Sequence, residues 1–362
     1  MARLRDLPFG LTSFDRAQFS LRNGLVGLAA IAGALVFLGL FGYAGIAALV
    51  GVVVTGLAAG RGPLRRRLRY GSAVAVAGSL LTVVGVWSGE TAWLAGLVAG
   101  LVTLGATLLA VYGKAIVTSA YVLNLWLLLA QGFSASDRTT QGLAASFLVG
   151  GLFVVALQPL RALVPHRSPP EAAEEDGAPE ESVAPSDRWA PIRAALSLDS
   201  PILQLAVVRA LAIGSAMVVG AYLFDGYPYW PALMAFVIIK SDPAESVASG
   251  VHRAVGTVAG AAVALALVHN VDSRPVLTAV VAVAAVLMVA TQRANEAVYA
   301  FFLTIVLLLA LRLVRADVEA ALTERIWATV LGVGLALGVM ALVAALVDRH
   351  RVEEGAPSAP RV

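Results

Sequence analysis

Residues 227–260 read YPYWPALMAFVIIKSDPAESVASGVHRAVGTVAG, and this stretch contains the features that decide the fold. Three aromatic residues and two prolines precede an apolar run of barely three helical turns. A polar turn, Lys240-Ser241-Asp242-Pro243, ends that run, and Arg253 comes directly before a second run rich in Gly and Ala. Apolar runs separated by short polar turns are typical of a chain that crosses a membrane many times.

The composition of the whole chain agrees with this interpretation. Hydrophobic residues make up 59% of the 362 residues and charged residues 14%, with a mean hydropathy of +0.84. A soluble domain carries about 25% charged residues, so this chain has too little polar surface to cover a globule in water. The sequence therefore predicts an all-α polytopic membrane protein. The basic N-terminus lacks a cleavage site after a short apolar core, which favours a cytoplasmic leader over a signal peptide.

The net charge of +3 and the pI near 9.4 do not indicate a nucleic-acid partner. The basic residues lie in short loops between apolar runs, where they set the orientation of a membrane protein. Cysteine is absent, which excludes disulfides and thiolate sites. The four histidines never stand at i, i+4 spacing, so the sequence predicts no metal site and no cofactor.

Twelve apolar segments are predicted as transmembrane helices, six on each side of a polar break. Several are shorter than the ~20 residues that a perpendicular helix needs to cross the hydrocarbon core, so ten helices is the alternative count. The predicted segments are 24–41, 43–59, 71–87, 91–111, 115–133, 142–164, 202–224, 228–240, 254–269, 275–291, 297–313 and 327–347.

The polar break divides the chain into two similar halves. Residues 166–200 are rich in Pro, Glu and Ala and are predicted as a cytoplasmic linker with a short interfacial helix. It separates a repeat in 1–165 from a second in 201–347, and 348–362 form a cytoplasmic tail. Gly42-Tyr43 matches Gly226-Tyr227 at an offset of 184 residues, and Arg69 matches Arg253 at the same offset. This pattern predicts two parallel six-helix repeats with function at their interface.

The distribution of basic residues predicts how the chain crosses the membrane. With a cytoplasmic N-terminus, most of the 26 Lys and Arg residues fall in inside loops, the run RGPLRRRLR at 61–69 included. This asymmetry places both termini in the cytoplasm of a bacterial-type plasma membrane. The outside loops hold only Arg138, Arg274, Arg312, Arg315 and Arg325.

Several spaced motifs resemble the fusaric acid resistance protein-like membrane family. Tyr229-Trp230-Pro231, the Lys240/Asp242-Pro243 turn and Arg253-Ala-Val-Gly-Thr257 with Gly260 match its aromatic start, polar turn and Arg-x-x-Gly-Thr-x-x-Gly helix entry. Ser200 before the helix with Arg209, and Arg325-Ile-Trp with Thr329 and Gly332, agree as well. The resemblance covers about 200–345. It implies a twelve-helix, two-half exporter of aromatic carboxylic acids or similar organic anions, although this chain lacks the large cytoplasmic domain of many relatives.

Such a substrate needs apolar walls for its ring and a cation for its carboxylate. The candidate substrate-binding residues are Arg209, Tyr227, Tyr229, Trp230, Lys240, Arg253 and Thr257, with Phe301 and Phe302 as further walls. Coupling to the proton gradient needs a titratable acid, for which Asp242, Glu245 and Glu296 are the candidates. Structural roles compete with these: an aromatic belt at the membrane surface, a snorkelling Lys240 or Arg209, and a salt bridge from Arg253 to Asp242 or Glu245.

Other functions are compatible with the same composition. A passive organic-anion channel would use the same basic lining without a coupling acid, and Gly/Ala-rich helix faces also suit an accessory structural membrane subunit. An enzyme is not predicted, because the short loops contain no HExxH, GxSxG or paired-carboxylate motif. The predicted partners are a small organic anion and the lipid bilayer, with no nucleic acid, and a homo-oligomer is left open.

Overall fold

The computed structural model is helical throughout the residues that it describes and contains no strand among them. The predicted all-α class is therefore confirmed for this part of the chain. The described residues are 15–16, 18–21, 25, 43–58, 63–135, 140–162, 189–197, 199–292, 294–313 and 318–353.

The chain divides into two compact units. Residues 34–210 form the first-half unit, and residues 211–362 together with 1–33 form the second-half unit. The boundary falls inside helix α9 (Pro201–Leu223), after Ala210. Most of the predicted linker lies outside the described residues, but a short helix, α8 (Ala190–Ala195), is present near its end.

Before the polar break, the described part of the first-half unit contains five apolar α-helices. α6 packs against α2 and α3, and α5 packs against α3 and α4. The short 3₁₀ helices η2 (Leu109–Tyr112) and η3 (Gly132–Ala135) extend α4 and α5. The five helices are α2 (Tyr43–Ala58), α3 (Leu64–Ser88), α4 (Ala92–Leu108), α5 (Lys114–Gln131) and α6 (Thr140–Ala162).

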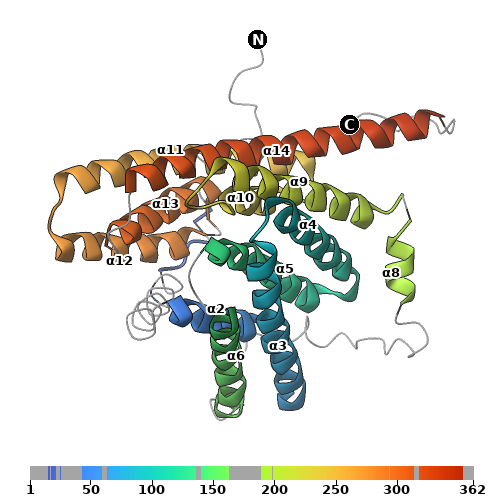
Figure 1. The fold of residues 1–362 in the computed structure, drawn as a ribbon, viewed down its shortest axis with the longest axis horizontal. Coiled ribbons are helices and arrows are strands. Elements are labelled where there is room, and N and C mark those ends of the chain that lie inside the picture. Colours follow the sequence, from blue (N-terminus) through green and yellow to red (C-terminus); the bar gives the residue numbers. More distant parts are fainter. Residues whose placement is uncertain are drawn as a thin grey trace. The chain divides into compact units, whose positions relative to one another are not determined.

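Five helices in the same order follow α9 in the second-half unit. α14 packs against α10 and α11, and α13 packs against α11 and α12 (Figure 1). The helices are α10 (Trp230–Ile238), α11 (Pro243–Asn270), α12 (Arg274–Thr291), α13 (Glu296–Leu313) and α14 (Val318–Glu353).

The two units pair their helices in the same way. At the offset of 184 residues, α2 to α6 correspond in order to α10 to α14. The most extensive helix contacts of one unit, such as that of α3 with α5, then have their counterparts in the other, here α11 with α13. This is the pairing that an internal repeat requires, and the repeat itself stays a prediction.

Each predicted segment except 24–41 coincides with a helix, and that segment lies almost wholly outside the described residues. Within the described residues, eight helices are long and apolar enough to span a membrane, and Ala47–Gly56 and Ile116–Gln131 are shorter apolar helices. The count of twelve therefore stays a prediction, whereas a multi-pass architecture is established.

Three helices begin earlier than the apolar runs predicted. α3 begins at Leu64 inside the arginine run, α11 at Pro243 and α14 at Val318. The predicted loop positions of Arg253 and Arg325 were therefore wrong. Charged residues end a hydrophobic run, but Arg and Glu are good helix formers and do not end a helix.

Helix α10 is too short to span a membrane, unlike the helices α11 and α14 that it packs against. Its nine residues cover about 13 Å at 1.5 Å per residue, less than half of the hydrocarbon core. The chain leaves the helix in an extended conformation at Ile239, which is 1% exposed. Irregular backbone at membrane depth occurs where protein surrounds it, so α10 is a broken helix buried among its neighbours.

Glycines allow α11 and α13 to approach closely. A Cβ atom at Gly256 would meet the carbonyl oxygen of Ala297, and one at Gly260 would meet that of Phe301. The close approach at these two glycines places the polar face of α11 against the start of α13.

The first-half unit has a neutral polar core. Trp126 stacks on Phe147 with ring centroids 5.2 Å apart, and its indole N–H donates to Thr82 Oγ1 over 2.9 Å. Asn124 donates to Thr103 Oγ1 and Gln131 to Ser88 Oγ. Buried uncharged side chains that bond to one another stabilise and orient helices. The core of this unit therefore resembles a scaffold more than an ion-binding site.

Part of the N-terminal leader docks on the second-half unit. The backbone N–H of Asp15 donates to the carbonyl oxygen of Ala294, and that of Ser20 donates to Ala290. Both acceptors lie where α12 ends and the turn to α13 begins. The leader thus belongs structurally to the half of the chain that comes last in the sequence.

Candidate functional site

Arg253 and Glu296 form a buried ion pair where α11 packs against α13. Arg253 Nε donates to Glu296 Oε1 over 3.1 Å, and the side chains are 8% and 26% exposed. The same carboxylate oxygen accepts a 2.7 Å hydrogen bond from Ser249 Oγ, one turn before Arg253. The guanidinium also lies 5.5 Å from the centre of the Tyr299 ring, within cation–π range.

A second arginine, Arg325, is buried nearby in α14. The residue is 4% exposed, and its guanidinium carbon lies 5.3 Å from the centre of the Trp230 ring. Its Nε has no hydrogen-bond partner among the described residues. Arg253, Tyr229 and Tyr299 all lie within electrostatic range of this guanidinium. Arg325 is therefore a buried cation whose surroundings are aromatic rings and another cation.

Glu324 does not neutralise Arg325, although the two are adjacent in sequence. Its carboxylate accepts the backbone N–H of Gly226 over 3.2 Å and that of Tyr227 over 3.0 Å. The carboxylate is therefore neither part of an ion pair with Arg325 nor a free loop charge. The reason is the helix: consecutive helical residues point about 100° apart, so Glu324 faces the loop before α10 while Arg325 faces the interior.

The aromatic residues that open α10 form a stacked group. The rings of Tyr227 and Trp230 lie 4.0 Å apart at an interplanar angle of 5°, and Tyr229 meets Tyr227 edge-on at 6.5 Å. Trp230 is buried, and both tyrosines are half-buried. Since a belt residue would face the membrane surface, the burial of Trp230 favours the site interpretation for this residue.

The electrostatic balance of the site is positive. The guanidinium of Arg253 in α11 pairs with one carboxylate, that of Glu296 in α13, and the guanidinium of Arg325 in α14 lies within electrostatic range of Arg253. A buried charge without a partner is costly, so such groups are usually kept for function. The surrounding rings of Trp230 and Tyr299 add apolar area but no negative charge. The arrangement can bind one anion, and its carboxylate or similar group would restore neutrality.

Each buried arginine is followed one turn later by a buried threonine. Thr257 and Thr329 are 1% and 2% exposed, and Thr329 Oγ1 donates to the carbonyl oxygen of Arg325 over 2.8 Å. The segments RAVGTVAG at 253–260 and RIWATVLG at 325–332 share the pattern Arg-x-x-x-Thr-Val-x-Gly. Arg325 was missed as a site residue, and this shared spacing is the signal that identifies it.

The other charged candidates lie at the start of α11 and have local roles. Asp242 caps the helix, because its Oδ1 accepts the N–H of Ala244 over 2.9 Å, and Glu245 is exposed in the first turn. The predicted pairing of Arg253 with either acid was wrong. Glu245 is two turns earlier, about 12 Å along the axis. Lys240 is half-buried, and its backbone N–H donates to Ser246 Oγ.

Arg209 lies in the first-half unit, in the part of α9 before the boundary. It is half-buried, and Tyr121 of α5 lies within its electrostatic range. Its contribution to the anion site stays a prediction. Among the described residues no group of three metal-binding side chains occurs.

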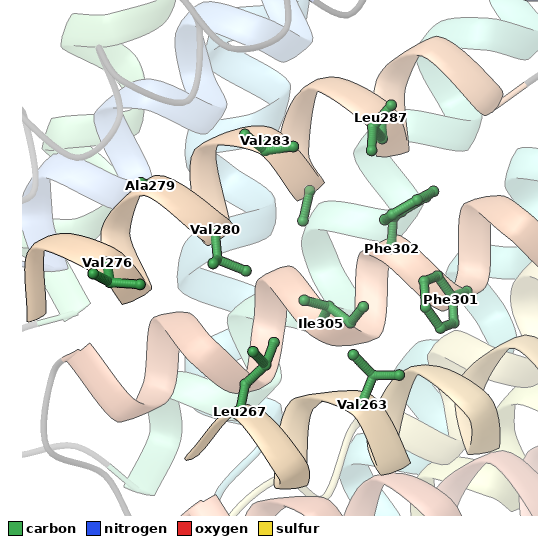
Figure 2. A pocket seen from close by; sticks show the side chains of 11 residues that line it. Val263, Leu267, Val276, Ala279, Val280, Val283, Leu287, Phe301, Phe302 and Ile305 are labelled. Atoms are coloured by element: carbon green, nitrogen blue, oxygen red, sulfur yellow. The ribbon is translucent and has the colours of Figure 1, made fainter. Parts of the chain in front are cut away.

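Phe301 and Phe302 line a separate apolar groove. The groove has a volume of about 480 Å³, lies between α11, α12 and α13, and is lined only by apolar side chains, among them Val263, Val280 and Ile305. Figure 2 shows the two phenylalanine rings beside these residues. None of the charged candidates contributes to its lining, so the structure does not bring these rings to the arginines.

Comparison with known proteins finds a match to one family model. The family model described as fusaric acid resistance protein-like matches residues 210–339, which include Trp230, Arg253, Glu296 and Arg325. This match confirms the resemblance that the sequence motifs indicated. No curated protein and no solved structure matches the chain.

Proposed function

We propose that this multi-pass membrane protein exports organic anions, on the premise that residues 210–339 match the family model described as fusaric acid resistance protein-like. Aromatic carboxylic acids are the substrate class. The observation that carries the proposal is the pair of buried arginines, Arg253 and Arg325, with the single carboxylate of Glu296 between the helices that hold them.

The chemistry of the site suits an aromatic acid. A carboxylate accepts hydrogen bonds from a guanidinium in a planar, bidentate geometry, and these bonds are strong where water is scarce. The ring of the substrate packs against Tyr229, Trp230 and Tyr299, which surround Arg325. Glu296 pairs with Arg253 while the site is empty, and the substrate carboxylate replaces it as the partner of Arg253 on binding.

The energy for export comes from the proton gradient. Its electrical component, negative inside, favours outward movement of an anion by about 2.3 kcal/mol per elementary charge and 100 mV. Glu296 is the carboxylate that would take up a coupled proton, because Asp242 and Glu245 are exposed at the start of α11. A passive organic-anion channel is the alternative, and it would respond to the potential but not to a pH gradient.

The remaining features of the proposal follow from the sequence. The chain lies in a bacterial-type plasma membrane with both termini in the cytoplasm. It acts as a transporter and not as an enzyme, with a small organic anion and the lipid bilayer as its partners. A homo-oligomer is compatible with the Gly- and Ala-rich helix faces.

Uptake of radiolabelled benzoate into proteoliposomes tests the proposal. We expect Arg325→Gln to lower uptake at low benzoate concentration roughly 10- to 100-fold, the effect of losing a charge-assisted hydrogen bond. Arg274→Gln is the matched control, because it removes an exposed arginine at the start of α12. The thermal stability of Arg325→Gln should not fall, since the Nε of Arg325 has no partner to lose.

Two comparisons decide the outcome. Equal benzoate uptake by Arg325→Gln, Arg274→Gln and the unmodified chain would refute the assigned site. Uptake measured with a potential alone and with an added pH gradient separates the alternatives: stimulation by the pH gradient supports coupling through Glu296, and dependence on the potential alone supports the channel.

A further inference from the structure

A hollow at the start of α3 is lined by basic side chains. It has a volume of about 570 Å³ and lies where the first turns of α3 leave the preceding loop. Its lining residues are Pro63, Arg65, Arg66, Arg69, Tyr70 and Ala73. No function proposed above uses this hollow, which belongs to the first-half unit.

Helical geometry separates the arginine run into two groups. Arg65, Arg66 and Arg69 lie on one face of α3 and line the hollow, together with Tyr70 one position later. Arg67 points elsewhere, because its Nη1 donates to Gln158 Oε1 of α6 over 3.5 Å. If the run served only to orient the chain in the membrane, the number of positive charges would matter and their directions would not. Here three of the four guanidiniums of 65–69 line one hollow.

The hollow is strongly positive. Among the residues that the structure describes, its lining contains three arginines and no acid, and the first turn of α3 has no acidic residue. The N-terminal end of a helix adds a partial positive charge of its own. An anion in this space would meet guanidiniums and the phenol of Tyr70. The chemistry of the hollow therefore selects a phosphate or a similar oxyanion.

The position of the hollow identifies the source of that phosphate. α3 is long and apolar enough to span a membrane, so its charged first turns lie where the helix leaves the hydrocarbon. Tyr70 is half-buried and packs against the core that contains Trp126 and Phe147, and tyrosine rings are enriched at the membrane–water boundary. We infer that Arg65, Arg66, Arg69 and Tyr70 bind the headgroup phosphate of an anionic phospholipid.

Native mass spectrometry of the purified full chain tests this lipid site. Dioleoyl phosphatidylglycerol is titrated into the protein in detergent, with dioleoyl phosphatidylcholine as the neutral-headgroup comparison. We expect the affinity for phosphatidylglycerol to fall roughly fivefold for each of Arg65→Gln, Arg66→Gln and Arg69→Gln, given about 1 kcal/mol per basic residue. The affinity for phosphatidylcholine should stay unchanged.

Arg67→Gln is the matched control, because it removes one charge from the same run but not from the hollow. It should retain the affinity of the unmodified chain. Equal losses in Arg67→Gln and Arg69→Gln would overturn the site in favour of diffuse attraction. Displacement of phosphatidylglycerol by millimolar inorganic phosphate would overturn the lipid assignment in favour of a soluble phosphate ligand.

A second variant distinguishes the loss of lipid binding from misfolding. Arg65→Lys with Arg69→Lys keeps the charge and therefore the topological signal, but it removes two planar guanidiniums. We expect this double variant to keep the melting temperature of the unmodified chain in phosphatidylcholine and to lose the extra stabilisation that phosphatidylglycerol gives by binding the folded state. Unchanged stabilisation by phosphatidylglycerol would count against recognition by these arginines.

Discussion

At the scale of single residues, the two buried arginines differ in what neutralises them. Arg253 has Glu296 at 3.1 Å, whereas the Nε of Arg325 has no hydrogen-bond partner in the described part of the chain. A site with one satisfied and one unsatisfied cation is poised to accept an anion, because the incoming charge removes an existing electrostatic cost. In the proposed function, Glu296 would compete with the substrate for Arg253.

Glu296→Gln tests this competition. Without the carboxylate, Arg253 loses its charged partner, so we expect the free energy of unfolding to fall by about 1–3 kcal/mol. The apparent melting temperature in detergent should fall by about 2–4 °C for each kcal/mol. Added benzoate should recover more stability in Glu296→Gln than in the unmodified chain, because no internal carboxylate competes.

Glu245→Gln is the control for this measurement. Glu245 is an exposed acid in the first turn of α11, so its replacement should change stability by no more than about 0.5 kcal/mol. If benzoate stabilises Glu296→Gln less than it stabilises the unmodified chain, Glu296 does not compete for the anion.

At the scale of helices, the site depends on the close contact of α11 and α13. Ser249 and Arg253 reach Glu296 because Gly256 and Gly260 let the two backbones approach. The broken helix α10 completes the arrangement, since it ends early and leaves Trp230 buried beside Arg325.

Gly260→Ala tests the role of this contact. A Cβ atom at position 260 would collide with the backbone of Phe301, so the helices must separate. We expect a loss of about 1–3 kcal/mol in stability, as for other overpacked interiors, together with weaker benzoate uptake. Gly334→Ala in α14 is the matched control, because a Cβ there has no atom within 4 Å. A melting temperature for Gly260→Ala equal to that of the control would contradict this account.

At the scale of the whole molecule, the orientation in the membrane can be tested without background labelling, because the chain contains no cysteine. Ser241 and Ser273 are exposed residues at opposite ends of α11. We expect Ser273→Cys to react with an impermeant maleimide on intact cells, and Ser241→Cys to react only after the membrane is opened. Reversed reactivity would invert the proposed topology.

The sequence predicted the positions of the helices better than it predicted their ends or the site. Hydropathy detects where lipid surrounds a helix, so the early starts of α3, α11 and α14 were missed. Arg253 and Trp230 were predicted from a motif. The partner of Arg253 was not, because Glu296 is 43 residues away and only the packing of α11 on α13 brings them together.

Arg325 shows a different limit of the same prediction. It was assigned to an outer loop, together with its neighbour Glu324, because the apolar run that predicts the last helix begins only at residue 327. In the folded chain a helix turns the two side chains to different sides. The repeated Arg-x-x-x-Thr spacing in α11 and α14 was available in the sequence and marks both arginines.

The docking of the leader has a consequence for biosynthesis. Asp15 leaves the ribosome long before Ala294, the residue whose carbonyl it binds. At 5–20 residues per second, the leader waits about 15–60 s for its acceptor. A segment that is translated early is therefore among the last to form its contacts. In a nascent chain arrested before α12, residues 15–20 would lack the residues to which their backbone N–H groups bind.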